Sequence, residues 1–168
     1  MKKIILLSVL TLIMSTCTVS YKFNGASIDY SKIKTIDIRD FQNQATSVYP
    51  PLTQTFNERL KDVFNRNTKL SFTNVNPDLE LEGEITQYDL APLAVAKDDN
   101  YASQTRLTMT VRMRFRNNKN PEEDKEETFS AYQDFPSSKL LDDVQDALIE
   151  EMTKEIVDQI FNSTMSNW

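Results

Sequence analysis

The sequence predicts an α+β fold, a two-layer sandwich with two helices packed on one face of a four-stranded mixed sheet. Four segments carry apolar side chains at every second position, which is typical of half-buried strands. Two further segments carry them at helical spacing. Their order is strand, helix, strand, strand, strand, helix, so we expect a parallel crossover followed by an antiparallel meander. The second sheet face is then left without a helix.

The first predicted strand is 33–41, where Ile36 and Ile38 alternate with polar residues. A helix follows from Pro51, because proline is accepted in the first turn of a helix. It should end near 65–67, where asparagine tolerates the left-handed cap. Its apolar stripe consists of Leu52, Phe56, Leu60, Val63 and Phe64.

The second long strand begins at Leu79, after a short extended piece over 70–75 and a turn at Asn76-Pro77. Strict alternation predicts that Leu79, Leu81, Gly83 and Ile85 share one face, and that Glu80, Glu82, Glu84, Thr86 and Tyr88 share the other. A long connection then covers 89–104.

The third strand, 105–116, also alternates, with its buried face made by Leu107, Met109, Val111, Met113 and Phe115. A turn over 117–124 leads to the fourth strand, 127–135. The last helix should open near Ser138 as N-cap, with Asp142 and Asp143 in its first turn, where the helix dipole favours negative charge.

The chain divides into a lipoprotein signal peptide over 1–16, a lipidated tether over 17–31, and a single α+β domain over 32–168. Two lysines and an apolar run precede Cys17, the only cysteine, at the position where a bacterial lipoprotein signal is cut and the thiol is acylated. An ordinary signal peptide or a buried cysteine is the alternative. Thr18 replaces the aspartate that retains lipoproteins at the inner membrane, so we expect a lipid anchor at the periplasmic face of the outer membrane.

Charge and composition exclude several classes of function. The net charge is −6, and loss of the two lysines of the signal lowers it to −8, which argues against a nucleic-acid partner. Histidine is absent and the single cysteine is assigned to acylation, so histidine triads, thiol nucleophiles and common zinc sites are excluded. Glu80, Glu82 and Glu84 could belong to an acidic hydrolase, but a solvated strand face explains them better. We therefore expect no enzyme, no cofactor and no metal.

One cluster of side chains remains, a row of arginines on the open sheet face. Arginine suits phosphate and carboxylate groups because its planar fork donates two hydrogen bonds at once. The row could therefore bind an anionic ligand, or it could pair across strands, with Glu82 opposite Arg112 and Glu80 opposite Arg114. On the other side the neighbouring strand offers the neutral Thr128 and Ser130. The row comprises Arg106, Arg112, Arg114 and Arg116.

The connection between the second and third strands is unusually apolar over residues 90–95. It could fold back over the sheet edge. The alternative hypothesis is that Leu90, Leu93 and Val95 insert into a partner or into lipid.

The sequences C-T-V-S-Y-K-F-N-G-A-S-I-D-Y, Y-A-S-Q-T-R-L-T-M-T-V, S-A-Y-Q-D-F and D-Q-I-F-N-S-T, in this order, resemble the LptE family of lipopolysaccharide-assembly lipoproteins. The resemblance implies two helices on a four-stranded sheet. It also implies an outer-membrane lipoprotein that plugs the LptD β-barrel, helps the barrel fold and assists delivery of lipopolysaccharide to the cell surface. A free-standing periplasmic lipoprotein module that binds or regulates another envelope machine is the alternative function.

Overall fold

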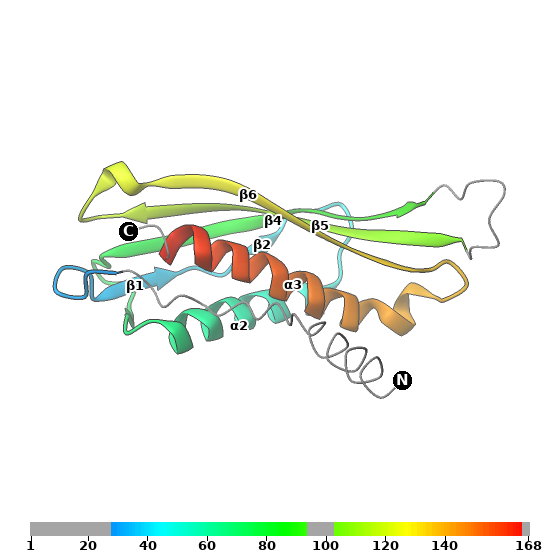
Figure 1. The fold of residues 1–168 in the computed structure, drawn as a ribbon, viewed down its shortest axis with the longest axis horizontal. Helices are drawn as coiled ribbons and strands as arrows, with labels where there is room; N and C mark the ends of the chain where they lie inside the picture. The colour runs from blue at the N-terminus through cyan, green and yellow to red at the C-terminus, as the bar shows by residue number, and fades with distance from the viewer. Residues whose placement is uncertain (1–27, 94–102, 166–168) are drawn as a thin grey trace, which may run out of the picture.

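Three long antiparallel strands and two helices form most of the structure, a computed structural model in which residues 28–93 and 103–165 are described. Figure 1 shows the sheet as one layer and both helices as the other. Cys17 and Val95 lie outside the described residues. The elements are β1 (Thr35–Ile38), β2 (Gln42–Asn43), α2 (Pro50–Asn67), β3 (Ser71–Phe72), β4 (Leu79–Pro92), β5 (Gln104–Asn117), the 3₁₀ turn η2 (Pro121–Glu123), β6 (Lys125–Pro136) and α3 (Leu141–Met165).

The sheet order confirms the predicted topology. β1 pairs in parallel with β4, and β4, β5 and β6 form the antiparallel meander. Along the sheet the order is β3-β1-β4-β5-β6, with β2 continuing beside β4 after β1. The class and the layers are as predicted, and the sheet gains two strands of two residues each, β2 and β3.

The predicted strand over 33–41 is interrupted because Phe41 turns into the core between β1 and β2. The side chain of Asn57 in α2 replaces a neighbouring strand there: its Oδ1 accepts from Phe41 N at 2.8 Å, and its Nδ2 donates to Phe41 O at 3.0 Å. The Phe41 ring occupies the space beside Gly83, where a Cβ would lie 2.3 Å from the ring. Gly83 is therefore required by close approach.

A β-bulge in β4 overturns one prediction about its faces. The register with β5 shifts between Ile85 and Gln87, so the residues beyond Thr86 exchange faces. Tyr88 is consequently buried, with 3% exposure, and its hydroxyl accepts a hydrogen bond from Gln145 Nε2 at 2.8 Å. Strict alternation had placed Tyr88 on the open face, and the extra residue at the bulge is the reason that this was wrong.

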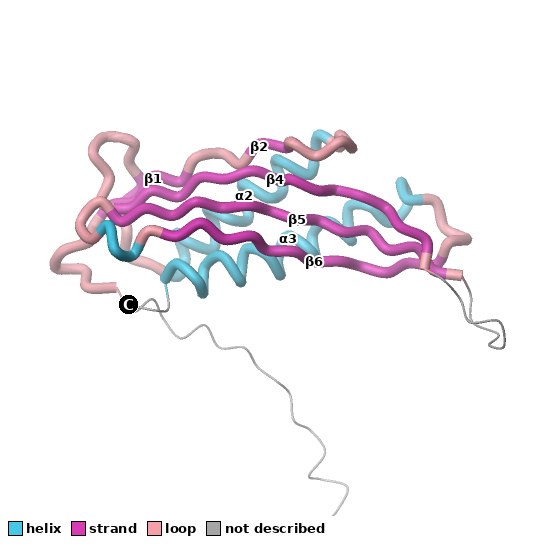
Figure 2. Tube along the Cα trace, turned by 90° about the horizontal axis from the view of Figure 1, so that it is seen from above, coloured by secondary structure: helices cyan, strands magenta, loops and turns pink. Residues whose placement is uncertain are grey.

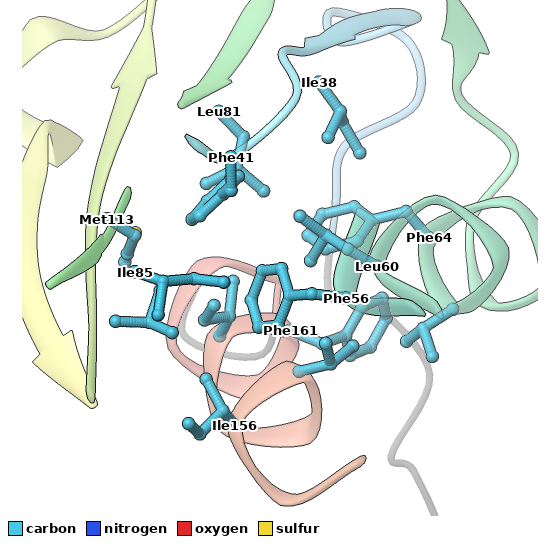
Figure 3. Packing of buried hydrophobic residues seen from close by; sticks show 14 of the residues in the cluster. Ile38, Phe41, Phe56, Leu60, Phe64, Leu81, Ile85, Met113, Ile156 and Phe161 are labelled. Atoms are coloured by element: carbon cyan, nitrogen blue, oxygen red, sulfur yellow. The ribbon is translucent and has the colours of Figure 1, made fainter. Parts of the chain in front are cut away.

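The two helices run parallel to each other beneath the sheet. Tyr49, just before α2, donates to Asp146 near the start of α3, and Phe64 meets Phe161 near the two helix ends with ring centroids 5.2 Å apart. Side chains from both helices and from the strands fill one continuous core (Figure 3). Within the described ranges no helix is long and apolar enough to cross a membrane.

The start of the last helix and the length of the long hairpin differ in detail from prediction. α3 begins at Leu141 rather than near Ser138, because residues after β6 form a turn in which Lys139 N donates to Pro136 O at 2.9 Å. Asp142 and Asp143 do lie in its first turn. The β4–β5 pairing continues to Pro92 opposite Thr105, so the strand is four residues longer than the alternation up to Tyr88 indicated.

The end of the sandwich at which β1 begins is held by a half-buried carboxylate. Asp78 accepts hydrogen bonds from the backbone N of Lys34 at 2.8 Å and of Thr35 at 3.1 Å, and Lys119 Nζ lies 3.0 Å away. Burial by itself would raise the pKa of Asp78, but the hydrogen bonds outweigh it and lower the pKa to about 2. This carboxylate therefore ties β1, β4 and the β5–β6 turn together.

Candidate functional site

The open face of the sheet carries the predicted arginine row. Arg112, Arg114 and Arg116 alternate along β5 with the buried residues Val111, Met113 and Phe115. Figure 2 looks onto this face, with the helices on the far side of the sheet. The four arginines therefore share one surface, as the alternation predicted.

Cross-strand pairing does occur, in a register two residues away from the predicted one. Arg112 pairs with Glu84, and Arg114 Nη1 lies 3.3 Å from Glu82 Oε1, whereas Arg116 is the residue opposite Glu80. The predicted pairs Glu82–Arg112 and Glu80–Arg114 are wrong. The predicted connection over 89–104 did not fix the register of the hairpin. Its first and last residues are themselves paired, since β4 and β5 extend beyond the alternating segments.

Arg106 has the most complete set of partners in the row. It donates two hydrogen bonds to Asp134 of β6, at 2.7 and 2.9 Å, and its guanidinium lies 3.7 Å from the ring centroid of Tyr132. The hydrogen bonds to Arg106 lower the pKa of Asp134. A bidentate pair stacked on an aromatic ring fits a structural role for this arginine.

Sequence reasoning missed Arg39, which joins the same surface from the loop after β1. Its guanidinium lies 2.6 Å from Glu82, 3.5 Å from Glu80 and 3.3 Å from Asp37. Because Glu80 also accepts a hydrogen bond from Asn118 at 2.8 Å, it is already engaged on both sides. In the sequence, Arg39 is only a polar position in the alternating segment 33–41. This pattern does not show that β4 is the neighbouring strand.

Arg116 differs from the other members of the row. It is exposed, it lies at the end of β5, and within the described residues it has no ion pair within 4 Å. The register places it opposite Glu80 but gives it no partner in β6, whose pairing begins at Phe115 with Lys125. Among the four arginines of the row, Arg116 is therefore the one without an ion pair in the described part of the chain.

A second exposed surface, the apolar end, lies around the β4–β5 hairpin, at the end of the long axis opposite the start of β1 (Figure 1). Leu90 is 47% exposed, and Leu93 lies just beyond β4. Two residues that sequence reasoning missed, Val48 before α2 and Leu140 before α3, are 79% and 72% exposed. Val48, Leu90, Tyr88, Leu107 and Leu141 line a surface depression of about 720 Å³ at this end.

The acidic side chains of the described ranges do not meet the requirements of a metal site. No group of three or more histidine, cysteine, aspartate or glutamate side chains there could hold a metal ion. Glu82 and Glu84 of β4 lie beside arginines, in ion pairs, and together with these arginines they line a surface depression of about 270 Å³.

Comparison with known proteins gives one family. The family model of LptE, described as lipopolysaccharide-assembly, matches residues 33–164. A search of curated protein sequences finds no match.

Solved structures with a similar fold have little sequence identity to this chain. A protein from Xanthomonas campestris has a TM-score of 0.57 at 9% identity, covering 86% of this chain and 89% of its own. A hypothetical protein from Chlamydia trachomatis has a TM-score of 0.53 at 10% identity, covering 80% and 99%. Rare lipoprotein B from Shewanella oneidensis has a TM-score of 0.47 at 16% identity, covering 76% and 92%. The first two show that the fold recurs.

The matched segment begins before β1 and ends one residue before the end of α3, so it contains every described strand, α2 and nearly all of α3. On this match the chain belongs to the LptE family of lipopolysaccharide-assembly proteins.

Proposed function

We propose that this chain is a non-enzymatic, lipid-anchored subunit of the lipopolysaccharide-assembly machinery that plugs an LptD-type β-barrel in the outer membrane. In this role it helps the barrel fold and assists delivery of lipopolysaccharide to the cell surface. The observation that carries the proposal is the LptE match over 33–164, which spans both layers of the sandwich. The chain has no histidine, and carboxylates such as Glu82 are held in ion pairs. In this proposal the protein therefore acts by binding its partners through its shape and surface charge.

The anchor in this proposal is acylated Cys17 at the periplasmic face of the outer membrane. At least two acyl chains hold a protein stably at a bilayer. The described chain starts at Ile28, at the end of the sandwich opposite the β4–β5 hairpin (Figure 1). The tether joins the sandwich at this end, so the hairpin end has no direct covalent link to the anchor.

The apolar end of the sandwich supplies the contact with the barrel in this proposal. Leu90 and Leu93 of the connection lie in or next to it, and Val48 and Leu140 enlarge the apolar surface. Val95 follows Leu93 in the sequence and lies outside the described residues. Exposed apolar patches with polar surroundings mark interaction sites. Aspartate at both Leu93 and Val95 is expected to weaken co-purification of the barrel, and unchanged association would remove the connection from the interface.

The arginine row supplies contacts to the phosphates of lipopolysaccharide. Arg116 is the strongest candidate, since Arg106, Arg112 and Arg114 already pair with carboxylates. Arg116→Gln is expected to weaken binding of purified lipopolysaccharide while leaving barrel association and folding stability unchanged. The matched control is Arg66→Gln, which removes an exposed arginine from α2 on the other layer. Equal loss in both variants would show that total charge, rather than the row, attracts the ligand.

Purification from solubilised envelopes tests the whole proposal. The tagged full-length chain should bring down a β-barrel of much larger mass, and its depletion should reduce lipopolysaccharide at the cell surface. A chain that purifies with a different envelope machine, and whose depletion leaves surface lipopolysaccharide unchanged, would establish the alternative function as a free-standing lipoprotein module.

A further inference from the structure

The outer side of the helix layer contains a groove between α2 and α3. It has a volume of about 560 Å³. The two helices that form its walls run parallel, because contacts join their starts and their ends. Its less polar lining includes Pro51, Thr55 and Ile149. The charged lining consists of Glu58, Arg59, Asp62, Asp146, Glu150, Glu151 and Lys154.

Carboxylates outnumber cations in this lining by five to two. Three of them have a partner: Asp62 pairs with Arg66, Asp146 accepts from Tyr49, and Glu58 accepts from Gln54. Glu150 and Glu151 have none within the described part of the chain, and no α3 carboxylate there lies in an ion pair. The groove therefore presents two uncompensated negative charges side by side.

A buried hydroxyl in the same groove also lacks a partner. Thr153 lines the groove, is only 1% exposed, and its Oγ1 forms no hydrogen bond within the described residues. The Nε of Arg59, in the opposite wall, is likewise buried and unpaired. Buried polar atoms in folded proteins are nearly always hydrogen-bonded, so these two atoms indicate an occupant with polar backbone or side-chain atoms.

We propose that this groove binds a short extended segment of a partner protein that carries lysine or arginine side chains. The cationic side chains pair with Glu150 and Glu151, and carbonyl oxygens of the segment accept from Thr153 Oγ1 and Arg59 Nε. From Pro51 to Asp62 an α-helix rises about 16 Å, which matches about five residues of extended chain. The proposal concerns the helix layer and does not depend on the barrel or on the arginine row.

Two features of the groove select a peptide among possible cationic ligands. A single metal ion needs converging oxygen ligands, and no such group of carboxylates occurs in the described ranges. An anionic membrane surface would be repelled by the net charge of α3, which has seven carboxylates and one lysine. An extended peptide supplies both the cationic side chains and the carbonyl oxygens.

Binding of a synthetic peptide, Lys-Ala-Lys-Ala-Lys, to the purified full-length chain tests the proposal. Fluorescence anisotropy should detect binding that weakens with salt, and a peptide with glutamate in place of lysine should not bind. The variant E150Q/E151Q is expected to lose about tenfold in affinity, as removal of two exposed ion pairs predicts. The matched control E155Q/E122Q removes the same charge outside the groove lining and should stay within about twofold.

Equal losses in the groove variant and the control variant would overturn the proposal, because the acidity of the whole chain would then explain binding. Thr153→Val provides a second measurement, since it keeps the side-chain volume and removes the hydroxyl. It is expected to lose about fivefold in affinity at low and high salt alike, because a neutral hydrogen bond contributes about 1 kcal/mol and is not screened. Unchanged affinity of this variant would overturn the assignment of Thr153 to the site.

Discussion

The two outer surfaces of the sandwich contain the same charged residue types but arrange them differently. On the open sheet face, Glu82, Glu84 and Asp134 each lie beside an arginine of a neighbouring strand. On α3, none of the carboxylates has an ion pair within the described residues. A sheet places residues of adjacent strands directly opposite each other, whereas the outer side of a helix pair leaves a groove between the walls. In the helix layer α2 does contain an ion pair, Asp62 with Arg66, so the contrast is between the sheet face and α3.

The pKa values of buried and half-buried carboxylates follow the same division. Hydrogen bonds from Arg106 lower the pKa of Asp134, whereas burial raises the pKa of Asp158 in α3 because Lys154 and Arg59 compensate it incompletely. Asp158 Oδ1 is also buried without a hydrogen bond in the described part of the chain. The sheet face therefore stabilises the ionised form of Asp134, whereas the helix layer destabilises the ionised form of Asp158.

Gly83→Ala should disturb the paired surface most strongly. The new Cβ would lie 2.3 Å from the Phe41 ring and 2.4 Å from Arg112 O, directly below the Glu84–Arg112 pair. We expect a loss of about 3 kcal/mol in the free energy of unfolding, measured by urea titration, because overpacking a tight contact separates the strands. Glu122→Ala, in an exposed turn, is the control and should change stability by less than about 0.5 kcal/mol. A loss below about 1 kcal/mol for Gly83→Ala would show that Phe41 moves aside freely.

Asp78→Asn should remove about 2 kcal/mol of stability at pH 7, as expected for a carboxylate whose pKa falls from 3.8 to about 2 on folding. Because the folded pKa lies below the unfolded one, the contribution is complete above about pH 4 and is lost as the pH falls toward 2. Urea titrations of both proteins at pH 7, 4 and 2.5 would measure this. A difference between the two proteins that stays constant over this range would contradict the role of the ionised form.

Asp134→Asn is expected to cost about 1 kcal/mol at pH 7, since the pair with Arg106 is bidentate but partly exposed. The loss should decrease at high salt, where screening weakens the pair in the parent protein. A double-mutant cycle with Arg106→Gln isolates the pair from the stacking on Tyr132. A coupling energy near zero would mean that the sheet face holds its charges without gaining stability from them.

Asp158→Asn should have the smallest effect and the opposite sign, a gain of less than about 1 kcal/mol at pH 7. Its folded pKa lies above the unfolded value, so the ionised form destabilises the fold, and this penalty disappears as the pH falls through the folded pKa. The gain should therefore be present at pH 7 and vanish in acid, as followed by thermal unfolding. A less stable variant at pH 7 would show that attraction to Arg59 and Lys154 outweighs burial.

Much of the open face could be predicted because alternation alone assigns a side chain to one face of a strand. It placed Arg112, Arg114 and Arg116 together and correctly opposed them to glutamates of the preceding strand. It could not identify the individual pairs, because a shift of two residues in register preserves every face and changes every partner. Tyr88 was misplaced for a related reason, since the bulge at Thr86 adds one residue that no local pattern announces.

The helix groove and Arg39 were not predictable in the same way. The burial of Thr153 does not follow from the spacing of apolar residues along its helix, because a threonine there is buried only where a neighbouring element covers it. Arg39 lies in a polar position next to β1, and only the pairing of β1 with β4 brings it to Glu82.

The order and periodicity of apolar residues by themselves determined the α+β class, the parallel crossover, the meander and the common face of the arginines. These properties follow from local geometry, because strands expose alternate residues and helices expose stripes. Only the tertiary structure decided which carboxylate pairs with which arginine and which carboxylates of α3 remain without an ion pair in the described residues. It also decided that the Phe41 ring leaves no room for a Cβ at Gly83. These depend on distances between segments far apart in the chain, which are set by packing and by register.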